Sequence, residues 1–260
     1  RPWGIPVRFH DVHTFRAKIN PDLLEFHLSY RDLEEPVEKY FSEVLPYRFV
    51  VHSPELFAHD HILDLAAADA GYRAQSLEHL KRVIELTRKL KNFFPNAPRP
   101  PIVVNIGGAT HDGFLDKNER EGLYERVMEA IRSLDTTGVE IIPQTMPPFP
   151  WHFGGQRYHN LFVDPSEIAA ICRSHNLRVC VDLAHAKLAC NHARASLSEY
   201  LEIVGPYAAH YHLADASGVD GEGLQIHEGE VDFAAAAEIM SRVSPSASFI
   251  PEIWQGHINH

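Results

Sequence analysis

No run of about 18 apolar residues occurs in the sequence, and no signal peptide is recognisable at its start. Positive charge is also scarce, because 24 Lys and Arg residues stand against 35 Asp and Glu residues and the formal net charge is −11. A surface that binds nucleic-acid phosphates or anionic lipids needs clustered Lys and Arg. The sequence therefore predicts a protein with no nucleic-acid partner and no membrane partner.

Cysteine is scarce as well. The three cysteines, Cys172, Cys180 and Cys190, are an odd number and show no Cys-x-x-Cys spacing, unlike a disulfide framework or a zinc site. This pattern favours a reducing compartment. We expect a cytoplasmic protein in which the cysteines are small, buried apolar residues.

No Gly/Ser-rich linker or block of charge divides the 260 residues, and 45% of them are hydrophobic. A chain of this length and composition can bury one large core. We predict a single domain over residues 1–260. Because the sequence opens with Arg-Pro-Trp-Gly instead of Met, we also expect that the domain is part of a longer polypeptide.

Short apolar runs alternate with helical patterns along the chain. Strands are predicted over residues 6–12, 23–29, 48–53, 102–106, 139–144, 178–182, 209–214 and 248–254. Helices are predicted over residues 34–44, 74–94, 116–134, 165–174, 196–204 and 232–243. Eight strands that alternate with mostly helical connections predict a (β/α)8 TIM barrel. A doubly wound open sheet is the alternative.

Six of the predicted strands end in a polar residue of the kind that binds metals or moves protons. The clearest case is the stretch from 178 to 187, where Asp182 follows four β-favouring residues and His185 comes three positions later. In a barrel the carboxyl ends of the strands meet at one mouth. The residues expected to surround it are His52, Asn105, Gln144, Asp182, His185, His212 and Glu252.

Three of these residues also have a structural interpretation. Asp182 is suited to cap a helix that follows the strand, His212 to be a hydrogen-bonded core histidine, and Glu252, beside Pro251, to end a surface strand. His210 lies two residues before His212 on the same strand face and is the better candidate for a core histidine.

A proline- and aromatic-rich loop over residues 147–157 is the other informative segment. We interpret it as a semi-rigid lid in which Trp151 stacks on a sugar and Arg157 binds an anion. The alternative is a loop whose aromatic side chains pack on the rim of the barrel.

Four short motifs occur in order along the chain: Val-Asp-Leu-Ala-His at 181–185, His-Leu-Ala-Asp at 212–215, Gly-Glu-Val-Asp-Phe at 229–233 and Pro-Glu-Ile at 251–253. In this order they resemble those of the xylose-isomerase-like barrels, a family that includes sugar epimerases, hydroxypyruvate isomerase and endonuclease IV. The resemblance implies a divalent metal ion at the barrel mouth. It implies that Asp182, His212 and Glu252 are metal ligands, that His185 contacts substrate or supports a ligand, and that His52 is a strand-three histidine of the site.

The chain departs from the family at two strands. Gln144 stands where the epimerases have a glutamate that binds metal and moves a proton; an amide oxygen can bind metal, but an amide cannot act as a general base. Asn105 stands where endonuclease IV has a histidine, and the Asp-x-His element of that enzyme is missing from residues 221–223.

We therefore predict a metal-dependent isomerase or epimerase of a sugar, a sugar phosphate or a hydroxy-keto acid. Asp182, His212, Glu252 and Gln144 are predicted to bind Mn²⁺, Mg²⁺ or Zn²⁺, with Glu252 as base and His185 or His52 as proton relay. The residues predicted to bind substrate are Glu25, His27, Asn105, Trp151, Gln156, Arg157, Asp215 and His257.

Two other functions are weighed against this prediction. One is a non-catalytic sugar-binding module of a larger polypeptide like the sialic-acid synthases, and the other, which the acidic composition disfavours, is a phosphodiesterase like endonuclease IV. The sequence leaves a homo-oligomer open.

Overall fold

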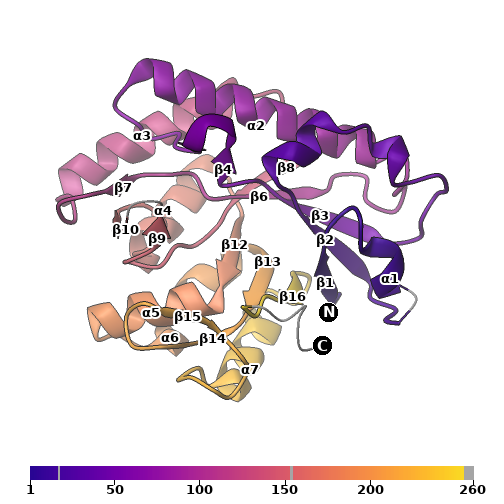
Figure 1. The fold of residues 1–260 in the computed structure, drawn as a ribbon. Coiled ribbons are helices and arrows are strands. Elements are labelled where there is room, and N and C mark those ends of the chain that lie inside the picture. The colour runs from indigo at the N-terminus through magenta and orange to yellow at the C-terminus, as the bar shows by residue number, and fades with distance from the viewer. Residues whose placement is uncertain (17, 153–154, 255–260) are drawn as a thin grey trace. The chain divides into compact units, whose positions relative to one another are not determined.

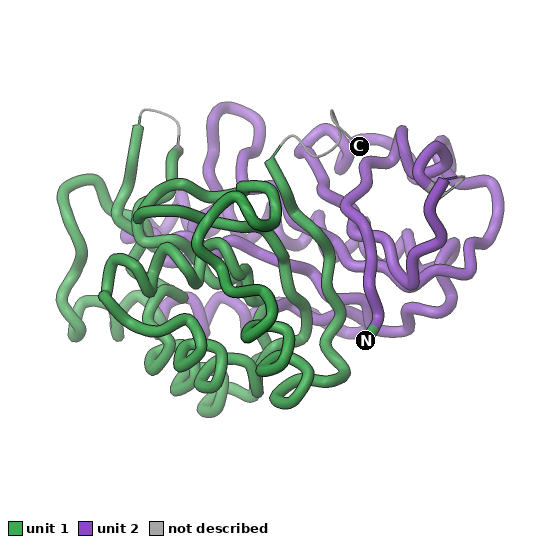
Figure 2. The backbone as a smooth tube through the Cα atoms, turned by 90° about the horizontal axis from the view of Figure 1, so that it is seen from below, with its two compact units in different colours: residues 1, 108–125, 143–260 green, residues 2–107, 126–142 purple. Residues whose placement is uncertain are grey.

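The computed structural model describes residues 1–16, 18–152 and 155–254. These residues form two compact units, shown in Figure 2. Unit 1 contains residues 1, 108–125 and 143–260, and unit 2 contains residues 2–107 and 126–142. The single-domain prediction stays a prediction.

Unit 2 is built on a five-stranded sheet with the order β1-β2-β3-β6-β8 (Figure 1). Its strands are β1 (Gly4–Val7), β2 (Leu23–His27), β3 (Arg48–His52), β6 (Pro101–Val104) and β8 (Glu140–Pro143), the last residue of which belongs to unit 1. The pairs β1–β2, β2–β3 and β3–β6 are parallel. The other elements of unit 2 are α1 (Val12–Arg16), η1 (Tyr30–Glu34), η2 (Val37–Lys39), β4 (Leu56–Phe57), η3 (Ala58–Asp60), β5 (His61–Ile62) and α2 (Ala70–Leu90).

Two predictions for this unit are wrong in detail. The strand predicted over 6–12 ends at Val7, and α1 follows. The helix predicted over 34–44 is absent, and η1 and η2 take its place. Pro36 explains the second error, since proline has no N–H and disfavours a helical conformation at the residue before it; Glu35 is extended, with φ −95° and ψ 139°.

Unit 1 contains a three-stranded parallel sheet with the order β12-β13-β16, formed by β12 (Val179–Asp182), β13 (Ala208–Leu213) and β16 (Ser248–Pro251). Its helices are α4 (Pro165–His175), α5 (Leu183–Ala193), α6 (Leu197–Val204), η4 (Gly205–Tyr207) and α7 (Phe233–Val243), and α3 (Lys117–Ser133) runs from unit 1 into unit 2. Short hairpins are formed by β7 (Ala109–Thr110) with β11 (Tyr158–His159), β9 (Trp151–His152) with β10 (Gly155–Gln156), and β14 (Asp215–Ser217) with β15 (Gly221–Leu224).

Helices cover the sheet of unit 1, so its strands are buried. All four residues of β12 are buried, as expected for a parallel strand between packed layers. Helix α5 packs against β12 and β13, and α6 packs against α4, α5 and α7. The three cysteines are buried and free, which confirms the expectation for them. No helix in the described part of the chain is long and apolar enough to cross a membrane.

Two elements near the candidate site are absent from the strands and helices predicted above. Helix α5 begins directly after Asp182, in agreement with the alternative in which Asp182 caps a helix after its strand. The hairpin β14–β15 lies in a Gly-rich stretch for which no strand was predicted. Both elements carry residues of the candidate site.

Candidate active site

The register of the sheet in unit 1 brings three strand-end residues together. Asp182, the last residue of β12, pairs with His212 on β13, and Leu213 pairs with Pro251 on β16. Glu252 follows Pro251 and donates its backbone N–H to the carbonyl oxygen of Leu213 at 3.0 Å. Because the strands are parallel, the three side chains emerge at the same edge of the sheet.

Asp182, His212 and Glu252 form a compact cluster. Each offers one ligand-type atom, and these atoms lie within 4.8 Å of one another. Nδ1 of His212 is 2.5 Å from a carboxylate oxygen of Glu252 and 3.8 Å from Oδ2 of Asp182. His212 is fully buried, the Asp182 side chain is 6% exposed and that of Glu252 is 30% exposed, so Glu252 is the accessible carboxylate of the cluster.

Gln144, the residue directly after β8, lies beside this cluster. It forms a parallel bridge with Cys180 of β12 and is buried. Its amide Nε2 donates to Oδ2 of Asp182 at 3.3 Å and lies 3.2 Å from Nδ1 of His212. Rotation of the amide by 180° exchanges this donor for an oxygen acceptor, an atom of the type that binds metal ions.

Nδ1 of His212 faces two carboxylates and an amide, yet one ring nitrogen either donates or accepts a single proton. Such a convergence is satisfied by a cation, which binds the lone pairs of all these groups together. Burial raises the pKa of Asp182, and the neighbouring Glu252 carboxylate adds to this rise, while His185 and His212 oppose it. The donor set of two carboxylates, one imidazole and one amide therefore fits a divalent metal ion.

His185 lies in the first turn of α5, beside the cluster. Its backbone N–H donates to Oδ1 of Asp182 at 2.9 Å, so Asp182 caps α5 while its Oδ2 faces the cluster. Nδ1 of His185 lies 2.7 Å from the carbonyl oxygen of Thr145, and Nε2 lies 3.3 Å from Oε2 of Glu222. Burial lowers the pKa of His185, but the Asp182 and Glu222 carboxylates and the Thr145 carbonyl outweigh burial and raise that pKa to about 10.

The sequence did not single out Thr145 or Glu222. Thr145 accepts the backbone N–H of Asp182 on its hydroxyl at 2.9 Å and contacts His185 through its carbonyl. Glu222 stands on β15, between two glycines. No local signal in the sequence indicates that this carboxylate meets a histidine 37 positions earlier.

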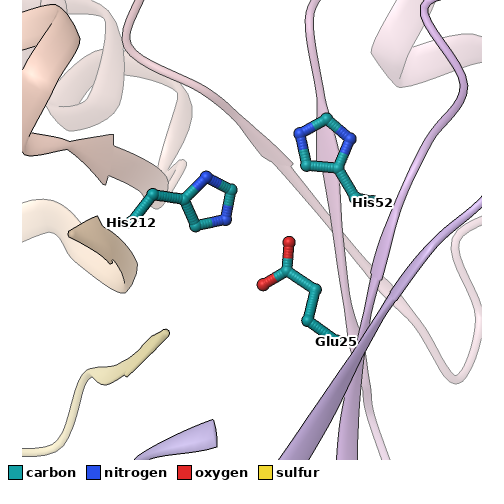
Figure 3. A group of neighbouring side chains, drawn as sticks. All are labelled: Glu25, His52 and His212. Carbon is teal, nitrogen blue, oxygen red and sulfur yellow. The ribbon is translucent and has the colours of Figure 1, made fainter. Parts of the chain in front are cut away.

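In unit 2, three of the predicted residues lie together. Figure 3 draws Glu25 and His52, which extend from the neighbouring strands β2 and β3, and also His212 of unit 1. Nε2 of His27 is 3.2 Å from Glu25, and the rings of His27 and His52 are 4.9 Å apart. Glu25 is fully buried. Asn105 follows β6, and its amide donates to Glu55.

Three of the remaining predicted residues belong to the loop over residues 147–157. Trp151 is 65% exposed, Gln156 is exposed and Arg157 is half-buried; the lid function of their loop stays a prediction. His257 lies outside the described residues.

Asp215 has a structural role. It is fully buried and accepts backbone N–H groups at 2.8–3.0 Å, which come from Ala216, His227, Gly229 and Val231. Burial raises the pKa of Asp215, but these hydrogen bonds outweigh it and leave the pKa below its ordinary value. Both carboxylate oxygens are engaged by the loop, and the substrate contact predicted for Asp215 stays a prediction.

The sequence of the chain matches the family model described as "Xylose isomerase-like TIM barrel" over residues 15–259. The chain belongs to this family. The prediction of a (β/α)8 barrel is confirmed, and the doubly wound alternative is wrong.

Comparison with individual proteins agrees with this membership. The uncharacterised protein MJ1311 of Methanocaldococcus jannaschii is 27% identical over 194 residues, which are 73% of this chain and 61% of that protein. The chain therefore spans about three fifths of the length of this curated relative.

Solved structures with the same fold have more distant sequences. A D-tagatose 3-epimerase-like protein is 20% identical with a TM-score of 0.68, and the match covers 100% of this chain and 94% of that one. The 3-keto-D-glucoside 4-epimerase YcjR of E. coli is 14% identical with a TM-score of 0.64, at 98% and 93% coverage. Endonuclease IV of Thermus thermophilus is 17% identical with a TM-score of 0.56, at 98% and 93% coverage.

Proposed function

We propose that this xylose isomerase-like barrel is a metal-dependent isomerase or epimerase that moves a proton next to a carbonyl group of a sugar, a sugar phosphate or a hydroxy-keto acid. The observation that carries the proposal is the convergence of Asp182, Glu252 and Gln144 on Nδ1 of His212 in unit 1.

Asp182, His212, Glu252 and the amide oxygen of Gln144 would hold the ion, which we propose to be Mn²⁺, Mg²⁺ or Zn²⁺ because mixed oxygen and nitrogen ligands suit all three. A bound divalent ion polarises a substrate carbonyl and makes a proton on the neighbouring carbon easier to remove.

Glu252 is the proposed base. Asp182 and His212 are almost fully enclosed, whereas the Glu252 side chain is 30% exposed, so a substrate reaches the Glu252 carboxylate first. Gln144 cannot take the proton, because an amide is not basic at ordinary pH. A single carboxylate therefore accepts the proton in this cluster.

His185 is the proposed partner in proton transfer. Its Nδ1 faces a carbonyl, which only accepts, so this nitrogen carries a proton. With a pKa of about 10, the imidazole is a proton donor at neutral pH and not a base. His52 stays a second candidate for the relay, and Glu25, His27, Asn105, Trp151, Gln156 and Arg157 stay proposed contacts for substrate.

The names of the structurally similar proteins support the sugar class. The D-tagatose 3-epimerase-like protein and the 3-keto-D-glucoside 4-epimerase are both named for epimerisation of a carbonyl sugar. The endonuclease IV likeness has a lower TM-score than either, and the net charge of −11 disfavours a DNA substrate. The free, buried cysteines support a reducing compartment such as the cytoplasm.

A turnover screen tests this proposal. Purified protein loaded with Mn²⁺, Mg²⁺ or Zn²⁺ is incubated with ketopentoses, ketohexoses and their phosphates, and exchange of substrate protons with D₂O is followed by NMR. We expect proton exchange in the metal-loaded parent protein and no exchange after a chelator is added. Asp182→Ala should abolish exchange, whereas the control Glu238→Gln, which changes an exposed residue, should exchange like the parent.

Two other outcomes would redirect the assignment. Sugar binding without exchange would favour the non-catalytic module, and cleavage of an abasic-site oligonucleotide would favour the phosphodiesterase. Either result contradicts the isomerase proposal.

A further inference from the structure

The hairpin β14–β15 carries Glu222 to His185, and three contacts hold this hairpin in place. Its strands pair at Asp215 with Leu224 and at Ser217 with Gly221. The carbonyl oxygen of Gly223 accepts the backbone N–H of Trp254 at 2.8 Å. Gly223 has φ +72°, and a Cβ atom there would lie 3.2 Å from Cβ of Trp254. The position of Glu222 is therefore set by the fold around it.

The base of the same hairpin is fixed by a buried carboxylate. Asp215 opens β14 and accepts backbone N–H groups from Gly229 and Val231, beyond the end of β15. The hairpin is thus tied at its base by Asp215 and along β15 by the chain that follows Glu252. Asp215 follows His212 by three positions, and Trp254 follows Glu252 by two.

Both ring nitrogens of His185 are engaged by different parts of unit 1. Thr145 contacts Nδ1 at 2.7 Å, and Glu222 contacts Nε2 at 3.3 Å. The His185 side chain is 14% exposed, whereas that of Glu222 is 45% exposed. A molecule that approaches from solvent therefore meets the carboxylate before it meets the ring.

We propose that Glu222 is a positioning residue, which holds Nε2 of His185 so that the imidazole ring is fixed beside Asp182. The Glu222 carboxylate also faces the hydroxyl groups of a polyhydroxylated carbonyl substrate. This inference rests on the proposed function for the identity of the substrate. The contact between Glu222 and His185 does not depend on it. Carboxylates are strong acceptors for sugar hydroxyls, and at position 144 an amide stands where the resemblance to the epimerases implies a carboxylate.

The test compares Glu222→Gln with Glu228→Gln, which removes an exposed carboxylate from the same segment. The ring nitrogens of His185 are observed by ¹H–¹⁵N NMR and assigned from their loss in His185→Gln. We expect Glu222→Gln to shift the Nε2 resonance and leave the Nδ1 resonance in place. An Nε2 resonance that is unchanged in Glu222→Gln, as in the control, would overturn the proposal even if no sugar is turned over.

Two further measurements separate positioning from a general effect on the fold. Affinity for Mn²⁺ should change less than twofold in Glu222→Gln, because Glu222 is not a ligand, and the melting temperature should match that of Glu228→Gln. With the ketose that exchanges fastest in the screen, KM should rise about tenfold. Loss of Mn²⁺ binding, or an unchanged KM and kcat, would contradict the proposal; absence of exchange in the parent protein would instead count against the proposed function.

Discussion

Two pairs of histidines, one pair in each unit, have opposite surroundings. In unit 1, His185 and His212 face the carboxylates of Asp182, Glu222 and Glu252. In unit 2, His61 and His79 pack against aromatic rings: His61 stacks on Tyr72 at 4.1 Å and His79 on Phe57 at 4.1 Å.

The pKa values follow these surroundings. The pKa of His185 is raised to about 10 because its carboxylate and carbonyl partners outweigh burial. Burial lowers the pKa of His61 and of His79, and His61 and Arg82 lower the pKa of His79 further. Burial alone thus favours a neutral core histidine, whereas burial beside carboxylates favours a histidine that keeps its proton and can donate it.

The largest expected effect comes from removing the accessible carboxylate of the unit 1 cluster. Glu252→Gln should lower turnover about 1000-fold, since a positioned base contributes about 10²- to 10⁴-fold. Folding should be unaffected, because Glu252 lies at the edge of the cluster. Initial rates and far-UV circular dichroism check both expectations, with Glu238→Gln as control. Activity close to that of the parent would remove Glu252 as the base.

Asp215, whose carboxylate accepts backbone N–H groups, should affect stability. Asp215→Asn should lower the free energy of unfolding by about 2 to 3 kcal/mol, because charge-assisted hydrogen bonds are weakened. Urea denaturation measures this loss. Because the pKa of Asp215 is lowered in the fold, its contribution is present above the unfolded pKa and is lost as pH falls through the folded value. A variant as stable as the parent at neutral pH would show that Asp215 does not fix the hairpin.

Acid should weaken the histidine cluster of unit 2. The folded pKa values of His61 and His79 lie below the ordinary histidine value of 6.5, so the unfolded chain binds more protons as pH falls below that value. The contribution of His61 and His79 to stability should be greatest above pH 6.5 and should fall on acidification by at most about 1.4 kcal/mol per pH unit for each histidine.

Urea denaturation at about pH 8 and about pH 5.5, on either side of the ordinary histidine pKa, measures this dependence. His79→Phe should reduce it, because Phe retains the stacking on Phe57 without a titrating group, and the exposed-site variant His10→Gln should retain it. A dependence that His79→Phe leaves unchanged would show that His79 is not a buried neutral group.

The cluster of Asp182, His212 and Glu252 was predictable because parallel strands place their carboxyl ends at one edge, and each residue directly follows an apolar run. Glu222 was not predictable, since its place depends on the hairpin and on Trp254 far along the chain. The helix over 34–44 was predicted from apolar spacing that is real, as Val37 and Phe41 are buried; Pro36 imposes another backbone on the same buried residues.

The histidines show the same limit of sequence reasoning. His210 was expected to be a core residue, and it is fully buried with Nδ1 2.7 Å from Oγ of Ser248. His61 lies in no predicted strand or helix, yet it is buried and its Nε2 lies 2.8 Å from Oγ of Ser76. Strand periodicity identified the face of His210, whereas the surroundings of His61 come from α2, which no local pattern near His61 reveals.

The most direct test of the account is metal affinity in two variants of the same strand. Calorimetric titration with Mn²⁺ and Zn²⁺ would compare His212→Gln with His210→Gln, two residues apart on β13. We expect the parent protein and His210→Gln to bind one ion each, and we expect the affinity for that ion to fall at least tenfold in His212→Gln. Equal affinity in both variants, or no binding in the parent, would contradict a metal site at Asp182, His212 and Glu252.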